Sequence, residues 1–461
     1  MDTMVKHTFI DSHCHLEMKD FDKDRADVIE MAHAAGVAWM INIGIDLEST
    51  QKGIALTEMF DTVYTTAGVH PHEVKTFDLQ MLKQLKTLAE SPSVVGIGET
   101  GLDYYYMHSP REIQQEAFKH QLALARDMNL PVVIHSRDAQ DDTLNIMKEF
   151  AQGLKGVLHC FSGSKAMAKQ ALDMGFLLSF SGIVTFDKAQ TLKEIAAMVS
   201  DDSFLIETDA PYLSPNPKRG KRNEPAFVVH TAQAIAQLRG ISLADVARIT
   251  SLNTKKLFNI GAVSQKAEIA YQIRDSLYLN ITSRCTNVCS FCIRFQTDTV
   301  KGHYLKLDRE PDAETVISSI GNPQGYKEVV FCGLGEPFLR LDVIKAVSSW
   351  VKQHGGKVRV NTNGQANLIY GRNILHELQG IVDSLSISLD AENEDKYNAI
   401  CSPNLPGAYK AVLDFIKEAP AYIPDVELSV VQTPTVDVEK CRAIAEKFKV
   451  RFRLRQLDAV G

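Results

Sequence analysis

The amino-acid sequence predicts an α/β protein with two domains, an N-terminal (β/α)8 TIM barrel and a C-terminal partial (β/α)6 barrel. Two observations support this fold class. Short apolar runs alternate with longer amphipathic stretches along the chain, which is the pattern of repeated βα units on a parallel sheet. The chain has 461 residues, and a single hydrophobic core rarely grows that large, so two domains of roughly 200–250 residues are expected.

Eight apolar runs occupy the first 260 residues, and a stretch with helical periodicity follows each of them. Eight strands that alternate with eight helices predict a closed barrel. Residues 242–260 are interpreted as the closing helices. The predicted strands cover residues 7–12, 38–44, 62–69, 93–98, 130–134, 156–159, 176–184 and 203–208.

The periodic pattern lapses near Gly261 and returns after Arg274. We therefore predict a first domain over residues 1–262, a linker over 263–274 and a second domain over 275–461. Six further βα units predict an open, partial barrel, which like the first domain should place its chemistry at the carboxyl ends of its strands. The predicted strands cover residues 276–282, 328–332, 357–361, 384–389, 426–432 and 451–455.

The composition is that of a soluble globular protein, with 45% hydrophobic and 23% charged residues. No apolar run approaches the roughly 18 residues of a membrane span, and the first residues lack the apolar region of a signal peptide. The net charge of −7 argues against a generally basic surface that coats nucleic acid. Eight scattered or closely grouped cysteines do not form a disulfide framework. We therefore expect a cytoplasmic protein without a membrane partner.

Six nitrogen and oxygen donors fall at the ends of predicted strands in the first domain. The carboxyl ends of barrel strands share one face, so these side chains can converge there. Imidazole and carboxylate donors without thiolate suit zinc, manganese or magnesium. Six donors exceed the needs of one tetrahedral ion, and two ions together can activate water and stabilise the leaving oxygen of a phosphodiester. The six donors are His13, His15, Glu99, His135, His159 and Asp209.

A basic segment follows Asp209 at the mouth of the predicted barrel. Such a loop can neutralise the phosphates of a nucleic acid, although a solvated surface loop is an equally good interpretation. The cations that we predict to bind substrate phosphate are Lys218, Arg219, Lys221 and Arg222.

Five segments of the first domain resemble the TatD family of metal-dependent deoxyribonucleases, which have amidohydrolase-like barrels. On that resemblance, His13 and His15 would bind one ion and His135 and His159 the other. Glu99 would bridge the two ions, and Asp209 would bind metal and act as the general base. The substrate would be DNA or a nucleotide. The segments are Asp11-Ser-His-Cys-His15, Gly68-Val-His-Pro-His72, Gly98-Glu-Thr-Gly-Leu-Asp103, Ile134-His-Ser-Arg-Asp-Ala139 and Glu207-Thr-Asp-Ala-Pro211.

Three cysteines stand within eight residues of the second domain, Cys285, Cys289 and Cys292. A four-iron cluster normally takes four thiolates, so three ligands leave one iron open for a small molecule. The alternative is a zinc site, but no nearby Cys or His completes a tetrahedral set. The C-x3-C-x2-C spacing resembles the signature of the radical S-adenosylmethionine (SAM) enzymes, in which SAM chelates the open iron of a [4Fe–4S] cluster.

Further segments extend this second resemblance. Phe291 resembles the aromatic residue that packs near adenine, and Gly333, Gly335 and Glu336 resemble the glycine-rich segment that holds the SAM amino group. Ser388 matches a later strand end that faces the cofactor. The resemblance implies reductive cleavage of SAM, which releases a 5′-deoxyadenosyl radical and needs a reductant such as flavodoxin or ferredoxin. The sequence does not name the substrate of that radical.

Two alternative functions stay open at this point. The cysteine domain could be a redox sensor that regulates the nuclease, although a sensor would not need the SAM-binding segments. The first domain could instead hydrolyse a small cyclic amide or ester, as other amidohydrolases do, although the basic loop and the TatD-like segments favour a phosphodiester. The leading hypothesis is a bifunctional enzyme.

Overall fold

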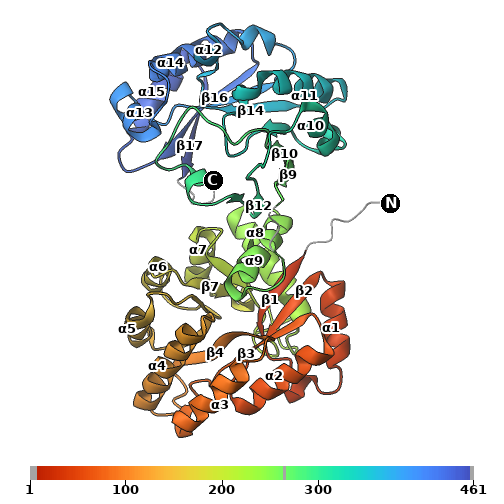
Figure 1. Ribbon diagram of the computed structural model, residues 1–461, viewed down its shortest axis with the longest axis vertical. Helices are drawn as coiled ribbons and strands as arrows, with labels where there is room; N and C mark the ends of the chain where they lie inside the picture. The colour runs from red at the N-terminus through yellow and green to blue at the C-terminus, as the bar shows by residue number, and fades with distance from the viewer. Residues whose placement is uncertain (1–7, 263–265, 457–461) are drawn as a thin grey trace. The chain divides into compact units, whose positions relative to one another are not determined.

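A computed structural model of the chain describes residues 8–262 and 266–456. Residues 263–265 of the predicted linker lie outside the described residues. The chain divides into two compact units, Met1–Val263 and Ser264–Gly461, and each is considered by itself (Figure 1).

The first unit is a barrel of eight parallel strands that neighbour one another in chain order. It closes between the first and last strands, where Cys14 pairs with Ala210 and the His15 N–H donates to the Ala210 carbonyl at 2.8 Å. The predicted (β/α)8 fold is thereby confirmed. The strands are β1 (Phe9–Cys14), β2 (Val37–Asn42), β3 (Val63–Ala67), β4 (Val94–Asp103), β5 (Val132–Arg137), β6 (Gly156–Leu158), β7 (Leu177–Phe180) and β8 (Phe204–Ile206).

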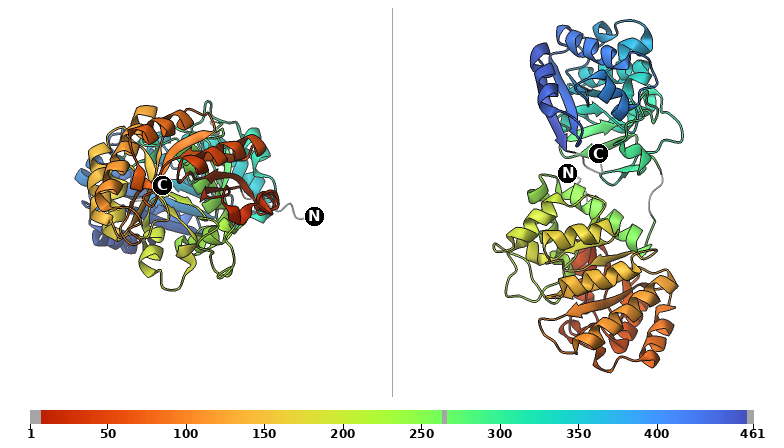
Figure 2. Two further views of the ribbon diagram at one scale, coloured as in Figure 1. Left: turned by 90° about the horizontal axis from the view of Figure 1, so that it is seen from below. Right: turned by 90° about the vertical axis from the view of Figure 1, so that its left-hand side faces the viewer.

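Helices surround these strands and cover their outer faces with apolar side chains (Figures 1 and 2). Local sequence sets where they begin; for example, the Asp46 side chain accepts the N–H of Ser49 and caps the helix that follows. The helices are α1 (Arg25–Ala34), α2 (Leu47–Met59), α3 (Leu79–Ala89), α4 (Arg111–Met128), α5 (Gln140–Phe150), α6 (Lys165–Asp173), α7 (Gln190–Met198), α8 (Val228–Arg239) and α9 (Leu243–Phe258).

The final helix of this unit closes the end of the barrel at which the strands begin. Asn253 of α9 donates to the carbonyl of Phe204, where β8 begins, at 2.9 Å. The end of α9 and the residues after it pack in one cluster with inward-facing side chains of several strands. This apolar plug leaves the opposite end, where the strands finish, for polar side chains. The cluster consists of Ile41, Ile43, Val95, Val133, Val157, Leu205, Leu257, Phe258 and Ile260.

The second unit is an open sheet in the order β17-β16-β15-β14-β13-β10-β9. Its six parallel strands confirm the predicted partial barrel. They are β10 (Ser276–Leu279), β13 (Val329–Phe331), β14 (Val358–Thr362), β15 (Ser384–Ser388), β16 (Asp425–Gln432) and β17 (Arg451–Gln456), while β11 (Thr299–Val300) and β12 (His303–Tyr304) form a separate small hairpin.

One strand of this sheet lies where the sequence predicted a linker. Strand β9 (Ala270–Ile273) pairs antiparallel with β10. Arg274 turns the chain with φ 55°, and Tyr271 is buried beside Leu305 and Leu334. Residues 270–273 of the predicted linker, 263–274, thus form an edge strand of the sheet.

Helices of the second unit cover one face of the sheet, where alternate residues of the parallel strands are apolar and buried. The helices are α10 (Ala313–Ile320), α11 (Leu341–Gln353), α12 (Ala366–Tyr370), α13 (Glu394–Cys401), α14 (Ala408–Glu418) and α15 (Val438–Phe448). Within the part of the chain that the structure describes, no helix has both the length and the apolar character required to cross a membrane.

Candidate metal centre and candidate cluster site

Glu99 lies at the centre of the predicted donors in the first unit. Its Oε1 lies 2.8 Å from His135 Nδ1 and 2.7 Å from His159 Nε2. Its Oε2 lies 3.3 Å from His13 Nε2 and 3.9 Å from His15 Nε2. The two oxygens of one carboxylate thus face two different pairs of histidines.

Asp209 faces one of these pairs. Its Oδ1 lies 3.5 Å from Nε2 of both His13 and His15. The residue has φ 59°, a left-handed conformation that is costly for a residue with a side chain. Its N–H donates to the carbonyl of His13 at 2.9 Å, so pairing with the end of β1 holds the strained backbone in place.

Two glycines explain how Glu99 comes to lie against β5. Gly98 and Gly101 both have φ 141°. A Cβ atom at Gly98 would lie 2.5 Å from the carbonyl oxygen of Val133, and one at Gly101 would collide with the carbonyl of His135. Because glycine has no Cβ, β4 can approach β5 closely and place the Glu99 side chain beside His135.

The structure adds four donors that the strand-end argument did not select. His70 Nε2 lies 3.4 Å from Glu99 Oε1, and Asp103 Oδ2 lies 3.1 Å from Nε2 of both His72 and His135. The sequence signal for these residues is the pair His70-Pro-His72 after the third strand and the continuation of β4 to Asp103, five residues beyond the predicted end at 98.

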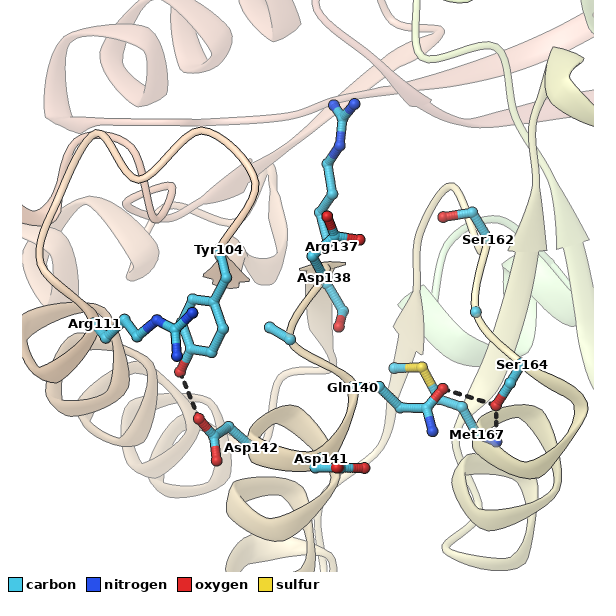
Figure 3. A pocket seen from close by; sticks show the side chains of 13 residues that line it. Tyr104, Arg111, Arg137, Asp138, Gln140, Asp141, Asp142, Ser162, Ser164 and Met167 are labelled. Carbon is cyan, nitrogen blue, oxygen red and sulfur yellow. Dashed lines mark hydrogen bonds between the residues drawn. The ribbon is translucent and has the colours of Figure 1, made fainter.

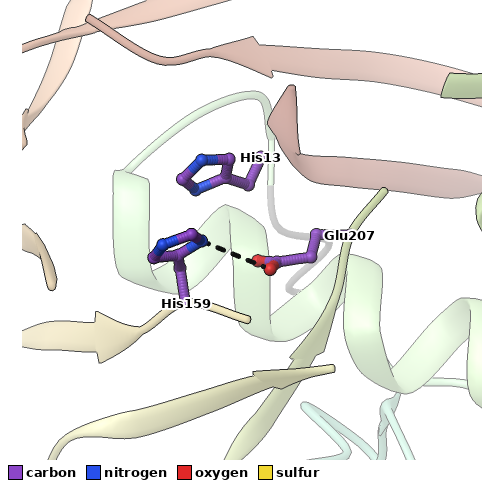
Figure 4. A group of neighbouring side chains, drawn as sticks. All are labelled: His13, His159 and Glu207. Carbon is purple, nitrogen blue, oxygen red and sulfur yellow. Dashed lines mark ion pairs between the residues drawn. The ribbon is translucent and has the colours of Figure 1, made fainter. Parts of the chain in front are cut away.

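Glu207 is the fourth additional donor, two residues before Asp209. Its Oε1 lies 3.5 Å from His159 Nδ1. The rings of His13 and His159 stack beside it, with centroids 3.9 Å apart (Figure 4). Glu207 directly follows β8, and its position at a strand end, like that of Asp209, is the signal that could have identified it.

The donor set fits divalent cations. Donor atoms within 4.8 Å of one another form three groups: His13, His15 and Asp209; His13, His159 and Glu207; and His70, Glu99 and His135. Among the described residues, His13 Nδ1 and Glu207 Oε2 are buried and lack a hydrogen-bond partner. Buried polar atoms usually have partners, so this clustering of imidazole and carboxylate is suited to metal ligation.

The electrostatics of the centre agree with this interpretation. Burial would raise the pKa of Glu99, but His159, His70 and His13 hold it well below its usual range. Burial lowers the pKa of His70 to about 4. Burial also acts to lower the pKa of His15, but Asp209 and Glu17 raise it to about 9. At neutral pH Glu99 is anionic and His70 is a neutral donor, while a metal ion would have to displace a proton from His15.

The four cations of the basic loop differ in their surroundings. Arg222 donates to both carboxylate oxygens of Asp24, at 2.9 and 2.7 Å, and to Glu224 at 3.1 Å. These bonds hold the loop against the start of α1 and occupy the guanidinium that we predicted to bind phosphate. Arg219 and Lys221 are exposed, and Lys218 is half-buried.

In the second unit, the three clustered cysteines lie on the loop that follows β10, and all are partly exposed free thiols. Burial raises the pKa of Cys285 to about 11. The loop is fixed by α13, because Val288 and Ser290 donate their N–H groups to the carbonyls of Cys401 and Ile400 at 2.9 Å. Cys401, which is isolated in sequence, lies beside Cys289 and holds the pKa of that thiol below its usual value.

The glycine-rich segment after β13 packs against this cysteine loop. A Cβ atom at Gly333 would collide with the Asn280 side chain, and one at Gly335 would lie 2.6 Å from the Thr282 carbonyl oxygen. The missing Cβ atoms let this segment approach the residues after β10 closely, which brings Glu336 close to the cysteine loop.

Glu336 is almost fully buried, and its carboxylate accepts three hydrogen bonds from the protein. The donors are the Phe338 N–H at 3.0 Å, the Thr362 hydroxyl at 2.8 Å and the Asn363 N–H at 2.7 Å. Burial raises its pKa to about 7. The side chain therefore ties the ends of β13 and β14 together beside the cysteine loop.

Two further residues were predicted to contact the cofactor, Phe291 in the cysteine loop and Ser388 at the end of β15. Phe291 is partly buried against the core of the second unit. Ser388 ends β15, where its hydroxyl lies 3.5 Å from the Ser429 hydroxyl and 3.4 Å from Arg455 Nη2.

Comparison with known proteins identifies both units. Residues 10–259 match the family model of the TatD related DNases, and residues 279–448 match that of the Radical SAM superfamily. The chain is 41% identical over 251 residues to the uncharacterized metal-dependent hydrolase YabD of Bacillus subtilis (strain 168), which covers 54% of this chain and 98% of YabD. It is 38% identical over 253 residues to the 3'-5' ssDNA/RNA exonuclease TatD of Erwinia tasmaniensis, covering 53% of this chain and 98% of that protein.

A solved structure shows the same relationship. The crystal structure of YJJV, a TatD homolog from Escherichia coli K12, matches with a TM-score of 0.53 and 30% identity, covering 55% of this chain and 98% of that chain. The chain therefore belongs to the TatD-related DNase family of metal-dependent hydrolases, and it carries a radical SAM domain after the TatD-like barrel.

Proposed function

We propose that the protein is a bifunctional enzyme whose first unit hydrolyses phosphodiester bonds in DNA or nucleotides with two divalent ions. The observation that carries this proposal is the position of Glu99, whose two oxygens face separate histidine pairs. A carboxylate placed in this way suits a pair of ions, and the imidazole and carboxylate donors suit zinc, manganese or magnesium.

Each residue of this centre has a proposed role. His13 and His15 would hold one ion together with Asp209, His135 and His159 would hold the other, and Glu99 would bridge the two. The ions would supply Lewis acidity for water and for the leaving oxygen. Asp209, which contacts only one histidine pair, would accept a proton from the attacking water.

Three further cations of the basic loop complete the proposed substrate site. Lys218, Arg219 and Lys221 would contact the phosphates that flank the cleaved bond, and such contacts position the nucleic acid without reading its sequence. Arg222 would instead hold the loop in place through its pairing with Asp24.

The test of the hydrolase begins with the full-length protein after metal removal. Manganese, magnesium or zinc should restore cleavage of single-stranded DNA, RNA or dinucleotides, and EDTA should abolish it again. Hydrolysis of a cyclic amide or ester, with no cleavage of any nucleic acid under each ion, would contradict the proposal and support the amidohydrolase alternative.

For the second unit, we propose reductive cleavage of SAM at a [4Fe–4S] cluster. Cys285, Cys289 and Cys292 would be the cluster ligands, and Glu336 would receive the SAM amino group. Phe291, Gly333, Gly335 and Ser388 would line the rest of the cofactor site. The cluster and SAM would supply a 5′-deoxyadenosyl radical. A flavodoxin or ferredoxin would provide the electron, and the need for a reducing compartment supports a cytoplasmic location.

A further inference from the structure

Two tyrosines at the mouth of the first barrel are exposed although they are large and largely apolar. Tyr105 and Tyr106 follow β4 directly and expose 58% and 52% of their surfaces. Their rings lie edge to face, with centroids 4.8 Å apart. Neither the barrel core nor the proposed metal chemistry uses these side chains, and neighbouring exposed aromatic rings commonly mark a binding surface.

The backbone that carries the tyrosines is fixed to the metal centre by Asp103. Oδ1 of this carboxylate accepts the N–H groups of Tyr105 and Tyr106 at 3.0 and 2.8 Å. Its Oδ2 lies 3.1 Å from Nε2 of His135 and of His72. One buried carboxylate thus fixes the backbone of both tyrosines relative to the proposed metal ligands. Because this segment is already ordered, it loses little conformational entropy when a ligand binds.

A cation lies over both rings. The guanidinium of Arg137, two residues after His135, lies 4.1 Å from the ring centroid of Tyr105 and 4.8 Å from that of Tyr106. Arg137 also lines a cavity of about 710 Å³ together with Tyr104, Arg111 and Ser164 (Figure 3). Two aromatic rings and a cavity therefore lie beside Arg137, which is two residues from His135.

We propose that Tyr105, Tyr106 and Arg137 form a stacking platform for the bases of single-stranded nucleic acid. This inference rests on the proposed nuclease function. Every base has a π-face that can stack on an aromatic ring, and Arg can stack on a base or neutralise a phosphate. In a duplex these faces are already covered by neighbouring bases. The platform thus favours an unpaired strand, whose backbone it would direct towards Glu99 and Asp209.

The experiment compares a single-stranded oligonucleotide with an abasic strand of the same length, which keeps the phosphates but has no base to stack. Full-length protein loaded with manganese is assayed as wild type and with Tyr105→Leu, Tyr106→Leu, Tyr105→Phe and Tyr106→Phe. Wild type should cleave the strand with bases at a lower KM. Each Leu variant should lose about five- to hundredfold of this preference, the scale of one lost base–aromatic stack, whereas the Phe variants should keep it.

Two controls separate folding from stacking. Metal content should be equal in all variants, since the substituted rings are exposed. The second control is Met59→Ala. Met59 is 70% exposed at the end of α2, at the end of the barrel where the strands begin and opposite the metal centre. This variant should keep the wild-type preference. An unchanged preference in both Leu variants would overturn the platform while the nuclease stands. If wild type cleaves neither strand, the proposed function fails and this inference fails with it.

Discussion

Glu99 and Asp209 are both carboxylates at strand ends, but their neighbours give them different proposed roles. Glu99 contacts His13 of β1, His135 of β5, His159 just after β6 and His70 after β3, whereas Asp209 contacts His13 and His15 at the end of β1. We expect Glu99→Gln to lower both metal content and turnover. We expect Asp209→Asn to keep most of the metal but to lower turnover by roughly 10²–10⁴, the usual scale for a lost general base.

Metal analysis and steady-state kinetics of the two variants separate these roles. If Asp209→Asn empties the centre while Glu99→Gln retains both ions, the bridging and base assignments are reversed or mistaken.

Glu336 stabilises the segment around it, so a variant that tests SAM binding has to keep the hydrogen bonds that its carboxylate accepts. Alanine would leave the buried N–H groups of Phe338 and Asn363 without their acceptor, which destabilises the segment whatever SAM does. We therefore predict the effect of Glu336→Gln, which keeps the shape and an acceptor oxygen but removes the charge. SAM affinity should fall about tenfold or more, because a hydrogen bond to a charged group is lost.

Calorimetry of SAM binding to the reconstituted protein measures this change. Iron content and thermal stability that match wild type provide the control. SAM affinity equal to that of wild type would remove Glu336 from the amino-group site.

At the scale of elements, α9 stabilises the barrel by closing the end where the strands begin. It starts with a reciprocal cap, in which the Ser242 N–H donates to the Asp245 carboxylate and the Asp245 N–H donates to the Ser242 hydroxyl oxygen, both at 3.1 Å. Burial would raise the pKa of Asp245, but the bonds from Ser242 and Arg248 hold it below its usual value. A carboxyl whose pKa is lowered by folding stabilises the folded state above its unfolded pKa and loses this effect as pH falls.

The predicted outcome is that Asp245→Asn destabilises the first unit by about 1 kcal/mol at neutral pH, the typical magnitude of a cap. The difference from wild type should shrink as pH falls from about 4, the unfolded pKa of Asp, towards the folded pKa. Thermal unfolding across this pH range measures it. A difference that is constant from pH 7 to strongly acidic conditions would show that the charge of Asp245 does not matter.

Sequence patterns predicted most strands of the protein but missed one edge strand and the end of β4. All fourteen predicted strands form. Most of them are buried apolar runs with a clear beginning and end, whereas β17 alternates charged and apolar residues. Strand β9 was missed because Ala270–Ile273 has only 4 residues and lies at the sheet edge. The end of β4 was missed because Gly98 and Gly101 interrupt its apolar pattern, although they allow the strand to continue to Asp103.

For similar reasons, only part of the candidate metal centre could be predicted from the sequence. The six predicted donors stand at or next to strand ends, where convergence follows from barrel geometry. His70 and His72 lie on a loop beyond β3, and no periodicity gives the path of a loop. Likewise, the pairing of Arg222 with Asp24 joins residues 198 positions apart and depends on tertiary packing.

At the scale of the whole molecule, the two units have separate cores and separate candidate sites. A chain of residues 1–262 includes every barrel strand and the closing helix α9. We expect it to fold alone and to retain metal-dependent cleavage with a kcat close to that of the full chain. Circular dichroism and nuclease assays of the two proteins make the comparison. A soluble, folded but inactive fragment would show that the second unit contributes to the hydrolase.

The redox-sensor alternative makes a different prediction at this scale. A sensor would make the cleavage of nucleic acid depend on the oxidation state of the cluster, but it would not consume SAM. The bifunctional account requires that SAM is consumed at a site built from Cys285, Cys289 and Cys292.

The most direct measurement is the formation of 5′-deoxyadenosine by the full-length protein after anaerobic reconstitution with iron and sulfide. With SAM and dithionite, wild type should form 5′-deoxyadenosine and methionine, and the triple Cys→Ala variant should bind no cluster and form neither. Wild type that holds about four irons per chain but leaves SAM intact would contradict the account. So would equal formation of 5′-deoxyadenosine by the variant.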